Sequence, residues 1–335
     1  MKKLIFFSLL VTLGLTSCLP GGYKYPEGTL PSVAVNLEAF NTSYDDYNST
    51  APSLGTLIPF CFSTNRISNG DNFDIIYRPM NINWDKNTGE LSVISEYGNW
   101  EIYREPLAIL EDALDLINSQ GNELGPYLAV NETSGDIDFL FLYASDATGN
   151  YRISFTYSGS SSSFNECQEI EFLNSASDDL YPAFNKDYSK IYFCSNRNSD
   201  VFNIYSTDLQ GDAGQLVTEL GNPGSREIIM EESLSGSYND KCPYIYSDIM
   251  VFASDRPGGE GGYDLYYSLF TDGQWGDPVS FGPSVNSPYD EYRPVIVNES
   301  VDHNRDMIIF SSDRPGGQGG FDLYFAGIDQ HLHIY

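Results

Sequence analysis

Basic residues and histidines are scarce in this chain of 335 residues. Lysine and arginine together number 17 against 47 acidic residues, which gives a formal net charge of −30. Because phosphate binding draws on clustered basic side chains, this balance excludes nucleic acid as a partner. The three histidines and the lack of a Gly-x-Ser-x-Gly element leave no catalytic triad to assign. Enzymatic activity therefore stays open, with a non-catalytic role favoured and no catalytic residue named.

Metal-binding patterns are equally sparse. The sequence has no Cys-x-x-Cys pair and no regular calcium loop. We expect no metal site and no cofactor, with calcium kept as an alternative that no motif supports. Besides Cys18, the cysteines are Cys61, Cys167, Cys194 and Cys242. Four cysteines allow three disulfide pairings that sequence cannot rank, and buried free thiols are equally compatible with their positions.

Long apolar runs are missing beyond the N-terminus. Lys2 and Lys3 precede the apolar run Leu4–Leu13, which is too short to span a membrane permanently. The following Leu15–Cys18 segment, Leu-Thr-Ser-Cys, resembles a bacterial lipobox. The resemblance implies that residues 1–17 are a signal peptide, that Cys18 carries lipid and that residues 18–31 form a tether to the membrane. It also implies an outer-membrane lipoprotein, on either the periplasmic face or the cell surface.

One structural unit recurs along the chain. Ala253–Tyr267 (ASDRPGGEGGYDLYY) returns at Ser311–Phe325 as SSDRPGGQGGFDLYF, and weaker copies occur at Phe62–Tyr77, Leu142–Phe155 and Phe193–Tyr205. Equivalent positions in successive copies are 81, 50, 59 and 58 residues apart, which suits the four-stranded blades of a propeller. The sequence therefore predicts that residues 32–335 form one all-β domain, a β-propeller of five blades.

Three local patterns refine this prediction. Glu105–Asn118 carries four leucine and isoleucine residues at helical spacing, so an inserted helix near 105–118 accounts for the longest offset. The last copy ends after its third strand while Ser32–Asn41 supplies a spare one, so the N-terminal strand is predicted to close the last blade. A sixth blade is the alternative if Asn81–Tyr103 pairs independently.

The repeated units resemble the TolB-type, WD40-like propeller repeats of bacterial envelope proteins. The Ser-Asp-Arg-Pro-Gly-Gly-x-Gly-Gly-Tyr-Asp-Leu-Tyr form is similar to copies found in Bacteroidetes beside peptidoglycan-binding domains. No such domain follows here, so peptidoglycan binding is not carried over. The resemblance implies a rigid platform whose channel mouth receives a partner from the cell envelope.

One set of polar residues repeats around the glycine-rich loop of each unit. An arginine at the loop entrance and an acid or amide at its exit are predicted to clamp each hairpin. These pairs are Arg66 with Asp74, Arg197 with Asn203, Arg256 with Asp264, and Arg314 with Asp322. In the second copy Ala147 replaces the arginine and Arg152 takes the exit position, from which it is expected to reach Asp146. Such a swap favours a structural clamp over an anion site built from the glycine amides.

A second set precedes the proline that is expected to open each innermost strand. Three residues upstream of Pro52, Pro126, Pro182, Pro243 and Pro294 stand Ser49, Glu123, Asp179, Asp240 and Glu291. If these strands line the central channel, the four carboxylates gather at one mouth as a candidate binding site for a cationic segment or a metal ion. The competing interpretation is that they bond nearby backbone in turns.

Two functional hypotheses follow. The main one is a lipid-anchored, non-catalytic platform that binds an envelope protein. The alternative is a propeller that binds or processes a glycan with its channel-facing carboxylates. For a glycan, Trp84, Trp100 and Trp275 are the candidate stacking residues, although packing within a blade is the more ordinary role of a tryptophan.

Overall fold

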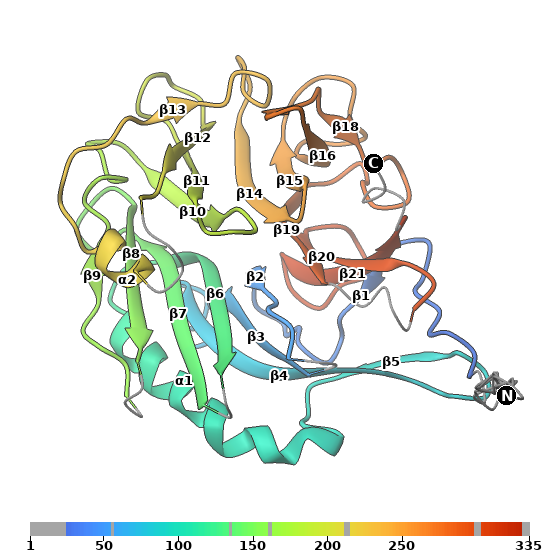
Figure 1. Cartoon of the computed structure of the whole chain (residues 1–335). Helices are drawn as coiled ribbons and strands as arrows, with labels where there is room; N and C mark the ends of the chain where they lie inside the picture. Colours follow the sequence, from blue (N-terminus) through green and yellow to red (C-terminus); the bar gives the residue numbers. More distant parts are fainter. Residues whose placement is uncertain are drawn as a thin grey trace, which may run out of the picture.

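The chain folds into a β-propeller of five blades around a central channel (Figure 1). The computed structural model describes residues 25–54, 57–133, 136–159, 163–210, 215–297 and 303–329. The predicted signal peptide and Cys18 lie outside the described residues, so both the signal peptide and the lipid anchor stay predictions. Across the ranges just given, no helix is long and apolar enough to cross a membrane.

Each blade is an antiparallel sheet, and in blades 1 to 4 the strands run in chain order from the channel outward. Blade 1 contains β2 (Asp46–Thr50), β3 (Leu57–Thr64), β4 (Asp74–Trp84) and β5 (Leu91–Ile94). Blade 2 contains β6 (Glu123–Thr133), β7 (Asp136–Ser145), β8 (Arg152–Ser158) and β9 (Gln168–Glu169). Blade 3 contains β10 (Asp179–Phe184), β11 (Lys190–Ser195), β12 (Asn203–Asp208) and β13 (Ile229–Met230). Blade 4 contains β14 (Asp240–Tyr246), β15 (Ile249–Ser254) and β16 (Asp264–Thr271), and β16 also pairs with both β17 (Gln274–Trp275) and β18 (Val279–Ser280).

The two ends of the chain meet in blade 5. It contains β19 (Glu291–Val297), β20 (Asp306–Ser312) and β21 (Asp322–Ile328), and its outer strand is β1 (Val35–Asn36) from the N-terminal region. Val35 pairs with Phe325 in the antiparallel register. The prediction that the N-terminal strand closes the last blade is therefore confirmed, and the closure joins the ring through hydrogen bonds.

The predicted inserted helix is present on the outside of blades 1 and 2. Helix α1 (Arg104–Ile117) follows a 3-10 turn, η1 (Gly98–Tyr103), and buries Leu107, Leu110 and Ile117. It packs beside β4 (Figure 1). The segment that was the alternative sixth blade supplies parts of β4 and all of β5, so the ring has five blades. A second, short helix, α2 (Leu216–Leu220), was not predicted.

Five apolar clusters hold the ring together, and each one joins two neighbouring blades. Between blades 5 and 1, for example, Phe60 and Phe62 pack with Val295 and Ile309, and all four side chains are fully buried. The cluster between blades 1 and 2 also includes the apolar face of α1. Burial of apolar surface between the blades, rather than within any one of them, therefore supplies most of the stabilisation.

Every innermost strand carries a bulge near its start. One residue in each adopts a left-handed backbone, with φ between 47° and 62°, and the strand pairing shifts there. These residues are Asn48, Gly125, Tyr181, Cys242 and Arg293. In four blades the expected proline comes directly after the bulge, so it lies inside the strand and does not open it. In blade 1 Ser49 holds that place, and Pro52 falls beyond the end of β2.

Candidate binding site at the mouth of the central channel

The first residue of every innermost strand is an acid. These residues are Asp46, Glu123, Asp179, Asp240 and Glu291, and each is 0 % exposed. Sequence reasoning found four of them but took Ser49 for the fifth, because Pro52 is not equivalent to the other prolines. A serine or threonine stands four residues before the acid in four of the blades, at Thr42, Ser119, Ser175 and Ser287, and this spacing points to Asp46.

The repeated arginines bind these buried acids and not the predicted loop-exit residues. Arg197 Nη2 lies 2.6 Å from Asp179, Arg256 Nη2 2.6 Å from Asp240 and Arg314 Nη2 2.8 Å from Glu291, while Arg66 pairs with Asp46. The predicted pairs Arg66–Asp74, Arg197–Asn203, Arg256–Asp264 and Arg314–Asp322 are therefore wrong in their second member. Each arginine turns inward because the acid of its own inner strand is buried and needs a counter-ion.

The loop-exit acids have a different task, which the glycines explain. Asp264 accepts hydrogen bonds from the backbone N–H groups of Glu260 and Gly261, and Asp322 accepts from those of Gln318 and Gly319. The glycine-rich loop does form an anion-binding concavity, and its own exit carboxylate fills it. In the third copy Asn203 differs, because it accepts from Gly236 N at 3.1 Å, outside its own loop, and donates to Ser199 Oγ at 3.2 Å within the loop.

Blade 2 lacks the arginine, and its acid stands without a cation. Glu123 accepts hydrogen bonds from Ser119 and from Ser145 Oγ at 2.7 Å, and burial raises the pKa of this carboxyl. Arg152 does not reach Asp146 as predicted. It pairs with Glu169 at 2.6 Å on the outer strand of the same blade.

Hydrogen bonds between blades fix a ring of aromatic residues around the channel mouth. An aromatic residue precedes the third strand of every blade, and its backbone carbonyl accepts from the N–H of the next blade's buried acid at 2.8 to 3.0 Å. The residue just before that acid is an aspartate or asparagine, and its Oδ1 accepts a hydrogen bond from the backbone N–H of the aromatic residue at 2.7 to 3.1 Å. The five aromatic residues are Phe73, Tyr151, Phe202, Tyr263 and Phe321, and all are partly exposed.

The residues that face the channel mouth are the neighbours of the predicted acids. Successive side chains of a strand point to opposite sides, so burial of the acid turns the next residue toward the channel. These next residues are Tyr47, Leu124, Leu180, Lys241 and Tyr292, and together with Tyr151, Asp178, Tyr181 and Phe202 they line an open cavity of about 330 Å³. The four predicted carboxylates lie beside this cavity and do not line it. Their contacts support a structural role, and ligand binding by them stays a prediction.

Aromatic rings contact one another along one side of the mouth. The Tyr292 ring lies 4.5 Å from that of Tyr263, 5.8 Å from Tyr47 and 5.9 Å from Phe321, measured between ring centres. Tyr47 also contacts Phe73. Burial raises the pKa of Tyr263 to about 12 and that of Tyr292 further, so both hydroxyls are neutral donors at physiological pH.

A lysine and an aspartate add polar groups to the aromatic mouth. Lys241 Nζ lies 4.3 Å from the ring centre of Phe202 and 5.5 Å from that of Tyr263. Asp178 lines the cavity, and its Oδ1 accepts from Tyr151 N at 3.0 Å. The mouth is thus a concave aromatic surface with a small number of placed polar groups, as ligand sites commonly are.

A buried arginine closes the channel beneath the mouth. Arg293 is 0 % exposed and donates to the backbone carbonyls of Ser49, Pro126 and Pro243, which belong to three other blades. Its guanidinium carbon lies 5.6 Å from the ring centre of Tyr181, in the remaining blade. Burial lowers the pKa of Arg293. The equivalent residues of the other blades are Asn48, Gly125, Tyr181 and Cys242, so Arg293 was visible in the sequence only as a break in the repeat and was not predicted.

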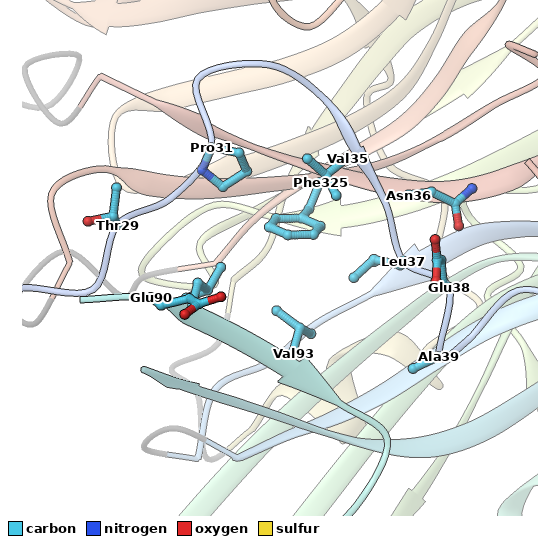
Figure 2. A pocket seen from close by; sticks show the side chains of 11 residues that line it. Thr29, Pro31, Val35, Asn36, Leu37, Glu38, Ala39, Glu90, Val93 and Phe325 are labelled. Carbon is cyan, nitrogen blue, oxygen red and sulfur yellow. The ribbon is translucent and has the colours of Figure 1, made fainter. Parts of the chain in front are cut away.

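A second hollow lies on the outer rim, where the N-terminal segment passes from blade 1 to blade 5. It measures about 690 Å³, and Figure 2 shows Leu37, Val93 and Phe325 on its apolar side with Glu38 and Glu90 near its edges. Its lining comes from blades 1 and 5 and the N-terminal segment, and Phe325 is the one described lining residue that belongs to a repeat copy. The mouth is the better candidate because its lining comes from all five blades.

The remaining sequence-based candidates lie away from the mouth. Trp275 is buried and donates to Tyr192, Trp84 donates to the carbonyl of Pro26, and Trp100 packs on Tyr103, so none of the three is a channel-facing stacking residue. The four described cysteines are free, at Cys61, Cys167, Cys194 and Cys242. Among the described residues, no group of three or more His, Cys, Asp or Glu side chains is placed to hold a metal ion.

Comparisons with known proteins identify similar folds. No family model and no curated protein sequence matches the chain. An endo-arabinase structure from Bacteroides thetaiotaomicron aligns with a TM-score of 0.48 at 15% identity, covering 90% of this chain and 97% of that one. The catalytic domain of a GH62 α-L-arabinofuranosidase from Coprinopsis cinerea gives 0.46 at 10% identity, covering 91% and 97%. A xylan β-1,4-xylosidase from Bacillus halodurans gives 0.49 at 10% identity, covering 88% and 54%.

These comparisons correct the expectations drawn from the repeat motif. The three solved structures just described are an endo-arabinase, an arabinofuranosidase and a xylosidase, and none is named as a TolB-type propeller, so the TolB-type resemblance is withdrawn. The non-catalytic platform for an envelope protein partner, which rested on that resemblance, is withdrawn with it. Identity at this level concerns the fold alone, and the five blades follow from the sheet topology of this chain.

Proposed function

We propose that the aromatic mouth of the central channel binds a glycan. The observation that carries the proposal is the ring of partly exposed tyrosine and phenylalanine side chains around an open cavity of about 330 Å³. The C–H faces of a sugar ring are flat and weakly polar, so they pack on aromatic faces, while its hydroxyl groups need polar partners at the edges. Asp178 and the tyrosine hydroxyls supply acceptors and donors of this kind.

Binding, and not hydrolysis, is what the described residues favour. Glycoside hydrolysis requires two carboxyl groups that flank the scissile bond, one of them a general acid with a raised pKa. Among the described residues that line the cavity, Asp178 is the single carboxylate. The inner-strand acids with a raised pKa, Glu123, Asp240 and Glu291, are 0 % exposed and bonded to serines or arginines.

The proposal is tested on a glycan array with the mature chain, which here means the chain without its predicted signal peptide, residues 1–17. The array should include arabinan and xylan oligosaccharides, because proteins of similar fold are named for those polymers. Any hit is then titrated by calorimetry against Tyr292→Ala and against Ile102→Ala, an exposed apolar residue on η1 that serves as the control. Loss of one stacking ring should weaken binding by about tenfold, the equivalent of about 1.4 kcal/mol. An unchanged affinity of Tyr292→Ala would refute binding at the mouth.

A further inference from the structure

Lys241 breaks the symmetry of the mouth. The residue after the buried acid is Tyr47, Leu124, Leu180 or Tyr292 in four blades, and in blade 4 it is a lysine. Repeated positions that serve packing have no need of a charge, and this chain carries only 17 basic residues against 47 acidic ones. A cation in the lining of the concave surface is therefore a feature of the site that the fold does not explain.

Aromatic rings hold the ammonium group of Lys241 in position, and they do not neutralise its charge. Nearby arginines of the ring each pair with a buried acid, whereas the contacts that the structure gives for Lys241 are the aromatic faces of Phe202 and Tyr263. Asp255 and Asp290, which flank this side of the mouth, are engaged by the backbone N–H groups of Asn239 and Tyr263. Aromatic faces hold a cation in position without cancelling its charge, so Lys241 remains available to an anion.

A second cation lies below the same cavity. Arg293 is buried among carbonyl groups, which are neutral, and its guanidinium faces Tyr181 in the cavity lining. A charge in the protein interior is screened less than one in water, so its field reaches the cavity floor. The mouth of a strongly acidic protein thus has one cation in its lining, Lys241, and a second, Arg293, buried beneath it.

From this arrangement we propose that the glycan bound at the mouth carries carboxylate groups, as polyuronides do, and that Lys241 pairs with one of them. The inference rests on the proposed function and specifies its ligand class. The sugar rings pack on Tyr292 and Tyr263, Asp178 accepts from a hydroxyl, and the carboxylate of one residue lies against the Lys241 ammonium.

The test compares an acid with its ester on the same sugar backbone. Oligogalacturonate and oligomannuronate are titrated into the mature chain, each beside its methyl ester, which keeps the ring and removes the charge. We expect the free acid to bind more tightly than the ester. Lys241→Met should weaken binding of the acid by about tenfold, and that of the ester by less than about twofold. Lys241→Arg should restore most of the affinity for the acid.

Lys186→Met is the matched control, since Lys186 is an exposed lysine in a loop between β10 and β11. It should bind the acid as the unaltered chain does, which separates local pairing from a change in net charge. Equal weakening of acid and ester by Lys241→Met would overturn the inference by showing that the lysine acts through packing. Tyr292-dependent binding of neutral glycans in preference to both acids would also overturn it and would leave the proposed function intact. Failure of every glycan, charged or neutral, would refute both.

Discussion

Replacing Arg256 by methionine removes the ion pair between Arg256 and Asp240, which clamps the second strand of blade 4 to its innermost strand, while keeping the packing of the methylene groups. The guanidinium lies 2.6 Å from Asp240 Oδ1, and Asp240 is fully buried. Asp240 Oδ2 already lacks a hydrogen-bond partner, so after the substitution Ser254 Oγ, at 2.6 Å, is the main remaining donor to this carboxylate. An uncompensated buried carboxylate costs about 3 to 5 kcal/mol. We expect the free energy of unfolding at about pH 8 to fall by about 3 kcal/mol.

The loss should depend on pH in a defined direction. Burial, the largest influence, already holds the pKa of Asp240 above its usual value, and removal of the arginine raises it further. A carboxyl whose pKa is raised in the folded state favours folding when protonated and opposes it when ionised. The deficit of Arg256→Met should therefore shrink as pH falls through the raised pKa, and Asp240→Asn in the same chain should reduce it at about pH 8.

Urea unfolding at pH values near 8 and near 5, followed by tyrosine and tryptophan fluorescence, measures both effects. Arg104→Met serves as the control, because its ion pair with Glu101 is largely exposed and should contribute less than about 1 kcal/mol. A loss below about 1 kcal/mol for Arg256→Met at the higher pH, or an equal loss at both pH values, would refute the argument that the clamp neutralises a buried acid.

Five further substitutions, grouped in three comparisons, test the fold by urea unfolding. Glu123→Gln should cost less than about 1 kcal/mol, since this acid has no cation to leave unpaired; a loss as large as that of Arg256→Met would contradict this. Gly261→Ala should cost more than about 2 kcal/mol, because the added Cβ would collide with the backbone of the next blade. Gly273→Ala has open space around the added Cβ but keeps a φ of 83°, so it should cost about 1 kcal/mol. A larger loss for Gly273→Ala than for Gly261→Ala would contradict this argument. Leu110→Ala should cost about 2 to 5 kcal/mol and Leu116→Ala, half exposed on the same helix, less than about 0.5; similar losses would dispute the packing of α1.

The fold could be predicted because its signals are local and repeated. A loop that opens with Asp or Asn, and reads Asp-Arg-Pro-Gly in blades 4 and 5, marks the turn between the second and third strands of each blade, so its spacing counts the blades. The apolar period of 107–117 marks a helix regardless of where that helix packs. Closure by β1 followed from counting strands, with one missing at the C-terminus and one spare at the N-terminus.

The site was predicted less well, for reasons of geometry. The acids were placed in the channel, but a strand alternates its faces, so burial of the acid against Arg256 or Arg314 directs the next residue, such as Lys241 or Tyr292, inward. The clamp pairs were misassigned because spacing within a hairpin does not reveal that the Asp264 carboxylate turns back onto the amides of its own loop. The circle of five aromatic residues around the channel mouth assembles from five loops that are far apart in sequence.

The most direct test of glycan binding at the mouth is a crystal structure of the mature chain with the oligosaccharide that binds best on the array. The account predicts a sugar ring packed on Tyr292 and Tyr263, with its polar edge toward Asp178 and Lys241. A ligand seated instead in the rim hollow near Phe325, with the mouth empty, would contradict it.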